Sequence, residues 1–196
     1  MLGHEYARVV VRDHMEASVP GRLALIRDRL QVTDPVNPKS YALLDSLPID
    51  AALYPMVMVQ STSLMSMRAT EAGQVGVWIC EYDVNVVAAC RAQIAGQWED
   101  ASRQRDRLLL AIRESLMTGR ELSPIAFVVT QGLTEQIGEA SQDVQGRPLA
   151  AGQVTVRVRV AEELTDTVAE ITHTEVLINP VTNGPTTVLT PEEIPT

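Results

Sequence analysis

Few residues in the chain have the side chains that catalysis or metal binding requires. The cysteines and histidines are Cys80, Cys90, His4, His14 and His173. Zinc sites bring Cys and His ligands together at short, repeated spacings, and these residues show no such spacing. Cys90 and His14 would make a thiol and its base, whereas a small apolar residue and a partly exposed histidine are the simpler interpretation of the pair. We therefore expect no metal site, no cofactor and no catalytic residue.

The paired acids do not indicate acid–base catalysis either. Glu162–Glu163 and Glu192–Glu193 are adjacent along the chain, and adjacent side chains of an extended segment point to opposite sides. We interpret both pairs as solvated charge. The sequence also contains no P-loop, no dinucleotide-binding glycine pattern and no nucleophile elbow. It therefore offers no recognisable active site.

The charged residues are unevenly distributed along the chain. The net charge of −9 argues against general binding to nucleic acid or acidic membranes. Residues 91–113 contain five arginines and three acids, whereas residues 161–196 contain seven acids and no lysine or arginine. A solvated surface explains this pattern, and so does an assembly with acidic and basic faces. Lys39 is the sole lysine; a GC-rich genome explains this bias, and arginine is also the better residue for interface ion pairs.

Four arginines of the segment 97–118 are candidate interface residues: Arg103, Arg105, Arg107 and Arg113. Arg105 interrupts an apolar stripe, so its stem either packs over the edge of the core or its charge pairs across a subunit boundary. We predict that this segment lies near such a boundary and pairs with acids of a neighbouring subunit. Each exposed pair would contribute about 0 to 1 kcal/mol, and several around a ring would add up.

The segment 75–119 organises the rest of the chain as one long strand followed by one long helix. In the strand, apolar residues alternate with Glu81, Asp83 and Asn85, the pattern of a half-buried strand. In the helix, apolar residues recur at steps of three and four. The apolar sets are Trp78, Cys80, Tyr82, Val84 and Val86 in the strand, and Trp98, Ala101, Leu108, Leu109, Ile112 and Leu116 in the helix. The two elements should pack on each other, and Gly119 should end the helix in a left-handed conformation.

The N-terminal third predicts two helices and a connector. Pro20 should separate a helix over residues 4–17 from one over residues 21–30, with a break near Val19. Leu23, Ile26 and Leu30 should face inward. A proline-rich connector without regular structure follows over residues 31–50. Residues 54–60 read as a buried strand.

The remaining segments predict further strands and loops. Residues 61–74 are polar around Leu64, Met65 and Met67, which indicates a hairpin loop or a mobile contact surface. A buried strand should follow Pro124, and a polar connection should span residues 132–152. Residues 154–160 form a clean amphipathic strand, whose antiparallel partner is predicted over residues 167–178. This order of elements indicates an α+β fold, with a mainly antiparallel sheet flanked by a long helix and by N-terminal helices.

The domain organisation is predicted to be one domain over residues 1–178 and an extended, proline-rich C-terminal arm over residues 179–196. Four prolines prevent the arm from forming a helix. Val188, Leu189 and Ile194 are apolar with nothing local to bury them, so we expect the arm to lie against an adjacent subunit or the ring beside it in an assembly; a disordered end is the alternative. No apolar run is long enough to span a membrane, and the N-terminus does not have the form of a signal peptide.

Several segments resemble the tail terminator, or head–tail joining, proteins of long-tailed bacteriophages. These segments are YDVNVVAAC, QWEDASRQRDRLLLAIRESLMTG, SVPGRLALIRDRL and YPMVMV, and the resemblance extends over residues 6–178. It implies a small α+β domain without enzymatic activity. It also implies a hexameric ring that caps the tail tube and docks it to the connector below the capsid. The arm from Asn179 onward departs from a minimal member of that family.

This resemblance implies a structural virion protein of the tail and neck, present in the host cytoplasm before assembly. Its expected partners are further copies of itself, the tail tube protein and the connector or stopper protein, and no membrane. Genomic DNA would pass through the lumen without specific binding, which suits a negative net charge. Two alternatives remain: another ring of the same junction, such as a stopper or adaptor, and a small thiol enzyme that uses Cys90 and a histidine.

Overall fold

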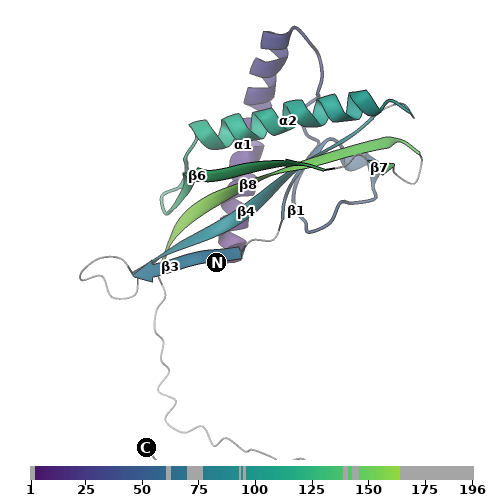
Figure 1. Cartoon of the computed structure of the whole chain (residues 1–196). Helices are drawn as coiled ribbons and strands as arrows, with labels where there is room; N and C mark the ends of the chain where they lie inside the picture. Colours follow the sequence, from purple (N-terminus) through teal and green to yellow (C-terminus); the bar gives the residue numbers. More distant parts are fainter. Residues whose placement is uncertain are drawn as a thin grey trace, which may run out of the picture. The chain divides into compact units, whose positions relative to one another are not determined.

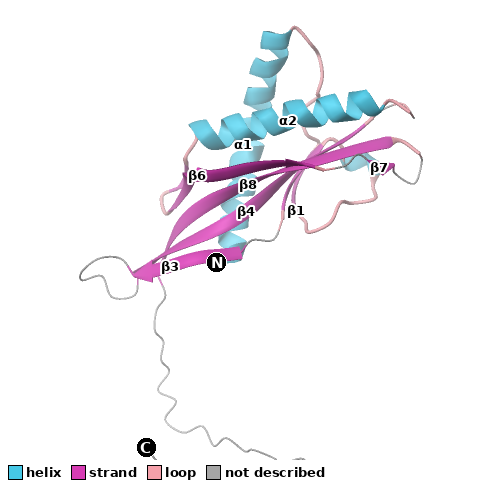
Figure 2. Ribbon diagram, in the orientation of Figure 1, coloured by secondary structure: helices cyan, strands magenta, loops and turns pink. Residues whose placement is uncertain are grey.

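The computed structural model describes residues 3–60, 63–69, 77–92, 94, 96–138, 141–142 and 146–163. These residues form an α+β fold with a mostly antiparallel sheet, which confirms the predicted fold class (Figures 1 and 2). The helices are α1 His4–Leu30, the 3-10 helix η1 Ala51–Leu53, and α2 Trp98–Thr118. The strands are β1 Ser40–Leu43, β2 Met56–Val59, β3 Ser63–Ala69, β4 Val77–Arg91, β5 Glu121–Ser123, β6 Ala126–Ile137, β7 Ser141–Gln142 and β8 Pro148–Glu163.

Two long antiparallel strands, β4 and β8, form the centre of the sheet. They pair from Val77 opposite Glu163 to Arg91 opposite Leu149. The strand order is β1-β2-β4-β8-β6-β5, with β3 paired to the first half of β4 and β7 to the start of β8. All pairs are antiparallel apart from β1 and β2.

The main core lies between one face of this sheet and the two helices. Figure 1 shows α2 lying along the sheet, with α1 crossing it. The predicted alternation of β4 is confirmed, since its apolar side chains from Cys80 to Val86 are buried. Alternate valines of β8 face the same core, as do the central residues of both helices. Of the predicted stripe of α2, the first residue, Trp98, is instead 37% exposed.

The N-terminal helix is continuous through Pro20, so the predicted break near Val19 is wrong. Val11, Met15, Val19 and Leu23 are fully buried along one face on both sides of the proline. Breaking the helix would remove several of these side chains from the core, each worth about 1.5–3 kcal/mol, whereas a proline inside a helix costs about 3 kcal/mol. The combined burial therefore outweighs the proline. Leu30, predicted to face inward, is 47% exposed.

We expect Pro20→Ala to raise the free energy of unfolding by about 1–2 kcal/mol. The substitution restores a backbone donor in the middle of α1 and removes the ring from the preceding turn, and part of the gain is offset by a more flexible unfolded chain. Urea denaturation of both proteins measures the difference. If Pro20→Ala instead lowered the free energy of unfolding, the result would support a break in the helix, with Pro20 at the start of a second helix.

The second half of the sheet differs most from the predictions. The predicted connection over residues 132–152 is largely strand, because β6 continues to Ile137 and β8 begins at Pro148. The pairing of β6 with β8 shifts register between Val129 and Thr134. Residues 154–160 pair with β4 on one side and β6 on the other. The predicted partner, residues 167–178, lies outside the described residues.

Three smaller predictions are also corrected. The connector contains a short strand, β1, which pairs parallel to β2. Residues 63–69 form the strand β3. Gly119 ends α2 with φ −105° and ψ 77°, outside the left-handed region. The position suits glycine for another reason, since an added Cβ would lie 2.4 Å from the ring of His14.

The chain divides into two units, Met1–Leu164 and Thr165–Thr196. Residues 164–196 lie outside the described residues. The segment 167–178, the arm over residues 179–196 and its Val188, Leu189 and Ile194 therefore remain sequence predictions.

Candidate assembly surface

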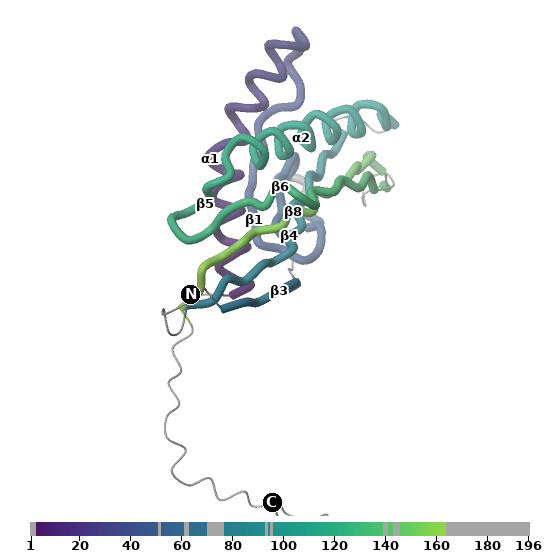
Figure 3. Tube along the Cα trace, turned by 60° about the vertical axis from the view of Figure 1, so that its left-hand side comes forward, coloured from purple at the N-terminus to yellow at the C-terminus, as the bar shows by residue number. Residues whose placement is uncertain are grey.

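Strand β3 is the longest fully exposed element among the described residues. All seven of its residues are exposed, and the exposed fractions of Leu64, Met65 and Met67 are 45%, 51% and 50%. It pairs with β4 alone among the described strands, so its outer edge is open. Figures 1 and 3 both show it at the end of the sheet away from α2. An exposed, apolar strand edge is typical of a surface that another chain covers.

The sheet face opposite the helices carries a ladder of polar pairs. Arg159 Nη2 lies 2.7 Å from Glu81 Oε1, and Arg157 Nε lies 2.8 Å from Asp83 Oδ1. The hydroxyl of Thr155 donates a hydrogen bond of 2.7 Å to the amide oxygen of Asn85. Each pair joins residues directly opposite each other on β4 and β8. The acids and bases balance, so this part of the face carries no large field of one sign.

The same face is apolar farther along the sheet. Met56, Met58, Val87 and Ala89 form a small second core with Tyr54. The hydroxyl of Tyr54 donates a hydrogen bond of 2.6 Å to the carbonyl of Pro48 in the connector. The connector is thereby attached to its own domain.

We expect the ladder to contribute stability that is lost in acid. The hydrogen bond from Arg159 is the main reason that the pKa of Glu81 lies below its ordinary value of 4.5. A carboxyl whose pKa is lowered by folding stabilises the protein above the unfolded pKa, and this contribution disappears as the pH falls through the folded pKa.

Glu81→Gln should therefore lower stability at pH 7 and make its decline below pH 4.5 shallower than in the wild type. Denaturant titrations from pH 7 to pH 3 measure both effects. Glu16→Gln, on the exposed side of α1, is the control and should follow the wild-type curve. Parallel curves for Glu81→Gln and the wild type would contradict this prediction.

The candidate arginines of α2 all have acidic partners in their own chain. Arg107 Nη1 lies 2.7 Å from Asp34 Oδ2 and also donates to the carbonyl of Asp34 at 3.1 Å. Arg103 lies 3.2 Å from Asp100 and 3.6 Å from Asp34. Arg107 is 16% exposed and Arg103 is 53% exposed. These contacts fasten the connector to α2.

Of the other two arginines, one is also mostly buried and the other is also about half exposed. Arg105 is 8% exposed, pairs with Asp106 at 2.8 Å and donates to the carbonyl of Gly138 at 3.3 Å. Arg113 is 46% exposed and pairs with Glu135 of β6 at 3.0 Å. Arg105 thus acts within the domain. Arg103 and Arg113 have exposed guanidinium groups, and their predicted contact with a neighbouring subunit stays a prediction.

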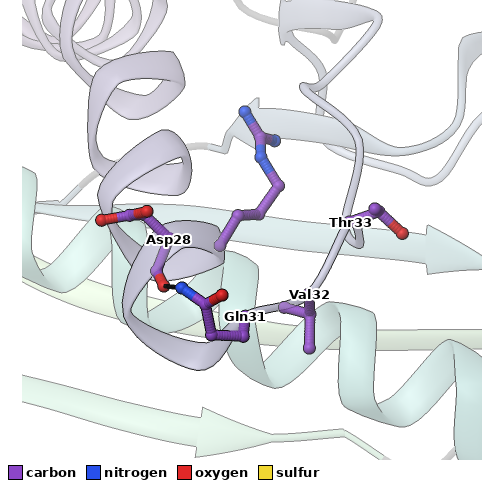
Figure 4. Close-up of a pocket in the computed structure, with 5 residues that line it drawn as sticks. Asp28, Gln31, Val32 and Thr33 are labelled. Atoms are coloured by element: carbon purple, nitrogen blue, oxygen red, sulfur yellow. Dashed lines mark hydrogen bonds between the residues drawn. The ribbon is translucent and has the colours of Figure 1, made fainter.

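Two shallow surface hollows flank the start of the connector. One, of about 510 Å³, is lined by Arg27, Asp28, Gln31, Val32 and Thr33 (Figure 4). There the side-chain amide of Gln31 donates to the carbonyl of Asp28 at 2.7 Å. The other, of about 470 Å³, is lined by Glu99, Ser102, Arg103, Asp106, Arg107 and Leu110. Both linings mix acidic and basic side chains.

The structure does not bring Cys90 and His14 together. Cys90 is fully buried beside Arg105, and burial raises the pKa of its thiol to about 12. His14 lies 3.3 Å from the carbonyl of Ser115. Ser115 is ten residues after Arg105 on α2, and ten residues span about 15 Å along a helix, so His14 is far from Cys90. A buried, protonated thiol without a base nearby is a poor nucleophile.

A different cluster of polar residues surrounds the start of α1. The hydroxyl of Tyr82 donates a hydrogen bond of 2.6 Å to Glu162, and the backbone N–H of Gly3 donates one of 3.2 Å to the same oxygen. The ring of His4 meets that of Tyr82 edge-on at 5.2 Å. Glu162 is 4% exposed, so its interpretation as solvated charge is wrong. The alternation of β8 was the signal for its burial, because Glu162 follows Val160 on the core face.

This cluster fastens α1 to the sheet. A carboxylate at the N-terminus of a helix accepts from free backbone donors and interacts favourably with the helix dipole. Burial and Glu162 together raise the pKa values of Tyr82 and of the neighbouring thiol of Cys80, so both stay protonated at neutral pH. The cluster therefore has a structural explanation.

Comparison with known proteins does not identify the chain. No family model matches the sequence, and no characterised protein does. Among the described residues, no group of three or more His, Cys, Asp and Glu side chains is placed to hold a metal ion. No helix in the described part of the chain has both the length and the apolar character needed to cross a membrane.

Proposed function

We propose that this protein is a structural subunit of a bacteriophage virion that forms a ring, with six copies, at the head–tail junction. The ring caps the tail tube and joins it to the connector. The proposal rests on the sequence resemblance over residues 6–178 and on an α+β fold of the kind that this resemblance implies. Genomic DNA passes through the lumen, where a chain of net charge −9 does not retain it.

The observation that supports an assembly role best is the open edge of β3. A closed ring needs a heterologous interface, in which two different patches of the subunit meet. β3 supplies one such patch, because Leu64, Met65 and Met67 are about half exposed on a strand that could accept a partner. Arg103 and Arg113 offer charged groups elsewhere on the surface. The arm over residues 179–196 is proposed to contact an adjacent subunit or ring.

The test is the position and copy number of this chain in an intact phage particle. We expect a cryo-electron microscopy reconstruction to show six copies around the tail axis, between the tail tube and the connector. Contact with the tail tube protein distinguishes a terminator from a stopper or adaptor. A single copy, or density away from the tail axis, would rule out the proposal. Native mass spectrometry with and without the tail tube protein shows whether the ring closes alone or on its template.

A further inference from the structure

Among the described strands, two have an open edge in the same half of the domain. β3 forms one edge through its pairing with β4, and β5 forms the other through its pairing with β6. On β3, Arg68 lies opposite Ile79, which in turn lies opposite Ala161 of β8.

On the other side, Glu121 of β5 lies opposite Phe127, which lies opposite Arg159 of β8. The levels of Arg68 and Glu121 thus differ by two residues of β8, or about 7 Å along the strand. Figure 3 shows both strands, with β5 and β3 on opposite edges.

The two edges carry opposite charges on the same face of the sheet. Directly opposed residues of neighbouring strands share a face, so Arg68 shares the face of Ile79, and Glu121 shares the face of Phe127 and Arg159. This is the face away from the helices. Arg68 and Glu121 are both exposed, and neither forms an ion pair within the described part of the chain.

The helix-covered face carries apolar side chains at both edges. Leu64 and Met67 lie opposite Tyr82 and Cys80, whose side chains point into the core. At the other edge, Leu122 packs against the same core and is partly buried. The two edges therefore carry complementary charges on one face of the sheet and apolar side chains on the other face.

We propose that β3 of one subunit docks against the β5 edge of a second copy of this chain, so that the sheets continue from subunit to subunit with Arg68 facing Glu121. This inference rests on the proposed ring and names the interface that closes it. Strand addition satisfies the open backbone groups of both edges, and the side chains select the partner. β3 contains no acidic residue, so a symmetric pairing of β3 with β3 would give Arg68 no partner of opposite charge and would leave β5 uncovered, which favours the head-to-tail arrangement.

The small size of the interface implies that assembly depends on the protein concentration or on a template such as the tail tube. β5 has three residues and β3 has seven, so one contact contributes few backbone hydrogen bonds. Closure of a ring makes the last contact intramolecular and raises the effective concentration of the edges. The subunit should therefore form rings at high concentration or on the tail tube, and dissociate when diluted alone.

The experiment reverses the two charges singly and together. Full-length wild type, Arg68→Glu, Glu121→Arg and the double variant are titrated in the presence of the tail tube protein, and native mass spectrometry measures the concentration at which half of the chain is in rings. We expect each single reversal to raise this concentration about tenfold, and the double variant to return to within about threefold of the wild type. Lys39→Glu changes the net charge as Arg68→Glu does, lies away from both edges, and should leave the value unchanged.

A second pair of variants tests the apolar part of the edge. Leu64→Asp should weaken ring formation by at least as much as Arg68→Glu, whereas Ile49→Asp, at a residue that is 84% exposed on the connector, should not. Thermal unfolding of the monomers checks that all variants fold. If the wild type, Arg68→Glu and Leu64→Asp form rings equally well, the proposed interface is wrong, while the proposed ring still holds. A wild type that forms no ring with the tail tube protein overturns the proposed function and this inference together.

Discussion

Gly152→Val is expected to lower the free energy of unfolding by about 3 kcal/mol, since inserting methyl groups into a packed core costs about 1–3 kcal/mol and sometimes more. Gly152 lies on β8 beneath α2. A Cβ added there would lie 2.8 Å from Leu109 Cδ1, 3.2 Å from the carbonyl oxygen of Gln136 and 3.3 Å from Arg105 Cδ. The backbone oxygen belongs to the neighbouring strand and cannot move without disturbing the sheet. Helix α2 must therefore lift from β8, or β6 must shift.

Urea denaturation monitored by circular dichroism measures this loss. Gly21→Ala is the matched control, because Gly21 lies inside α1 and an added Cβ meets nothing within 4 Å. That control should gain about 0.5–1 kcal/mol from the higher helix propensity of alanine. A Gly152→Val protein as stable as the wild type would show that α2 packs less closely on β8 than described.

Leu23→Ala is expected to lower the free energy of unfolding by about 2–5 kcal/mol, the usual cost of truncating a buried leucine. Leu23 is fully buried on the face of α1 that also carries Val19 and Ile26. Truncation leaves a cavity between α1 and its neighbours, where both the transfer energy and the packing contacts of the side chain are lost.

Leu30→Ala is the matched comparison at the end of the same helix. Leu30 is 47% exposed, so its truncation should change stability by no more than about 0.5 kcal/mol. Chemical denaturation of the two variants side by side gives the difference. Equal losses would indicate that α1 turns at Pro20 and presents Leu30 to the core, as the proline alone suggests.

The periodicity of the sequence was sufficient for the central elements. The strand through Cys80, Tyr82 and Val84 and the helix that follows it were predictable, because each buries one face and leaves the other to water. The same alternation, followed to the end of β8, would have placed Glu162 in the core. Because Glu162 is followed by a second acid, we interpreted both side chains as exposed to solvent. Sequence alone does not show which hydrogen-bond donors surround a buried carboxylate.

The candidate surface was predictable only in part. The Met-rich segment around Met65 was recognisable as a possible contact surface, but its strand conformation depends on β4, far along the chain, for its hydrogen bonds. The complementarity of Arg68 and Glu121 could not be found from sequence at all. Residues 53 positions apart become the two edges of one half of a sheet only when β4, β8 and β6 lie between them.

The sequence by itself determined the fold class, the central strand and helix, and the face that each presents to the core, since these follow from local periodicity and from the apolar area each element must bury. Only the tertiary structure decided whether α1 passes through Pro20, which strands occupy both sides of β8, and which acids pair with the arginines of α2. The physical reason is that these outcomes are set by contacts between distant segments. The burial of Val19 and Leu23 outweighs a local proline signal, and the position of Asp34 beside Arg107 depends on the packing of two helices and a connector.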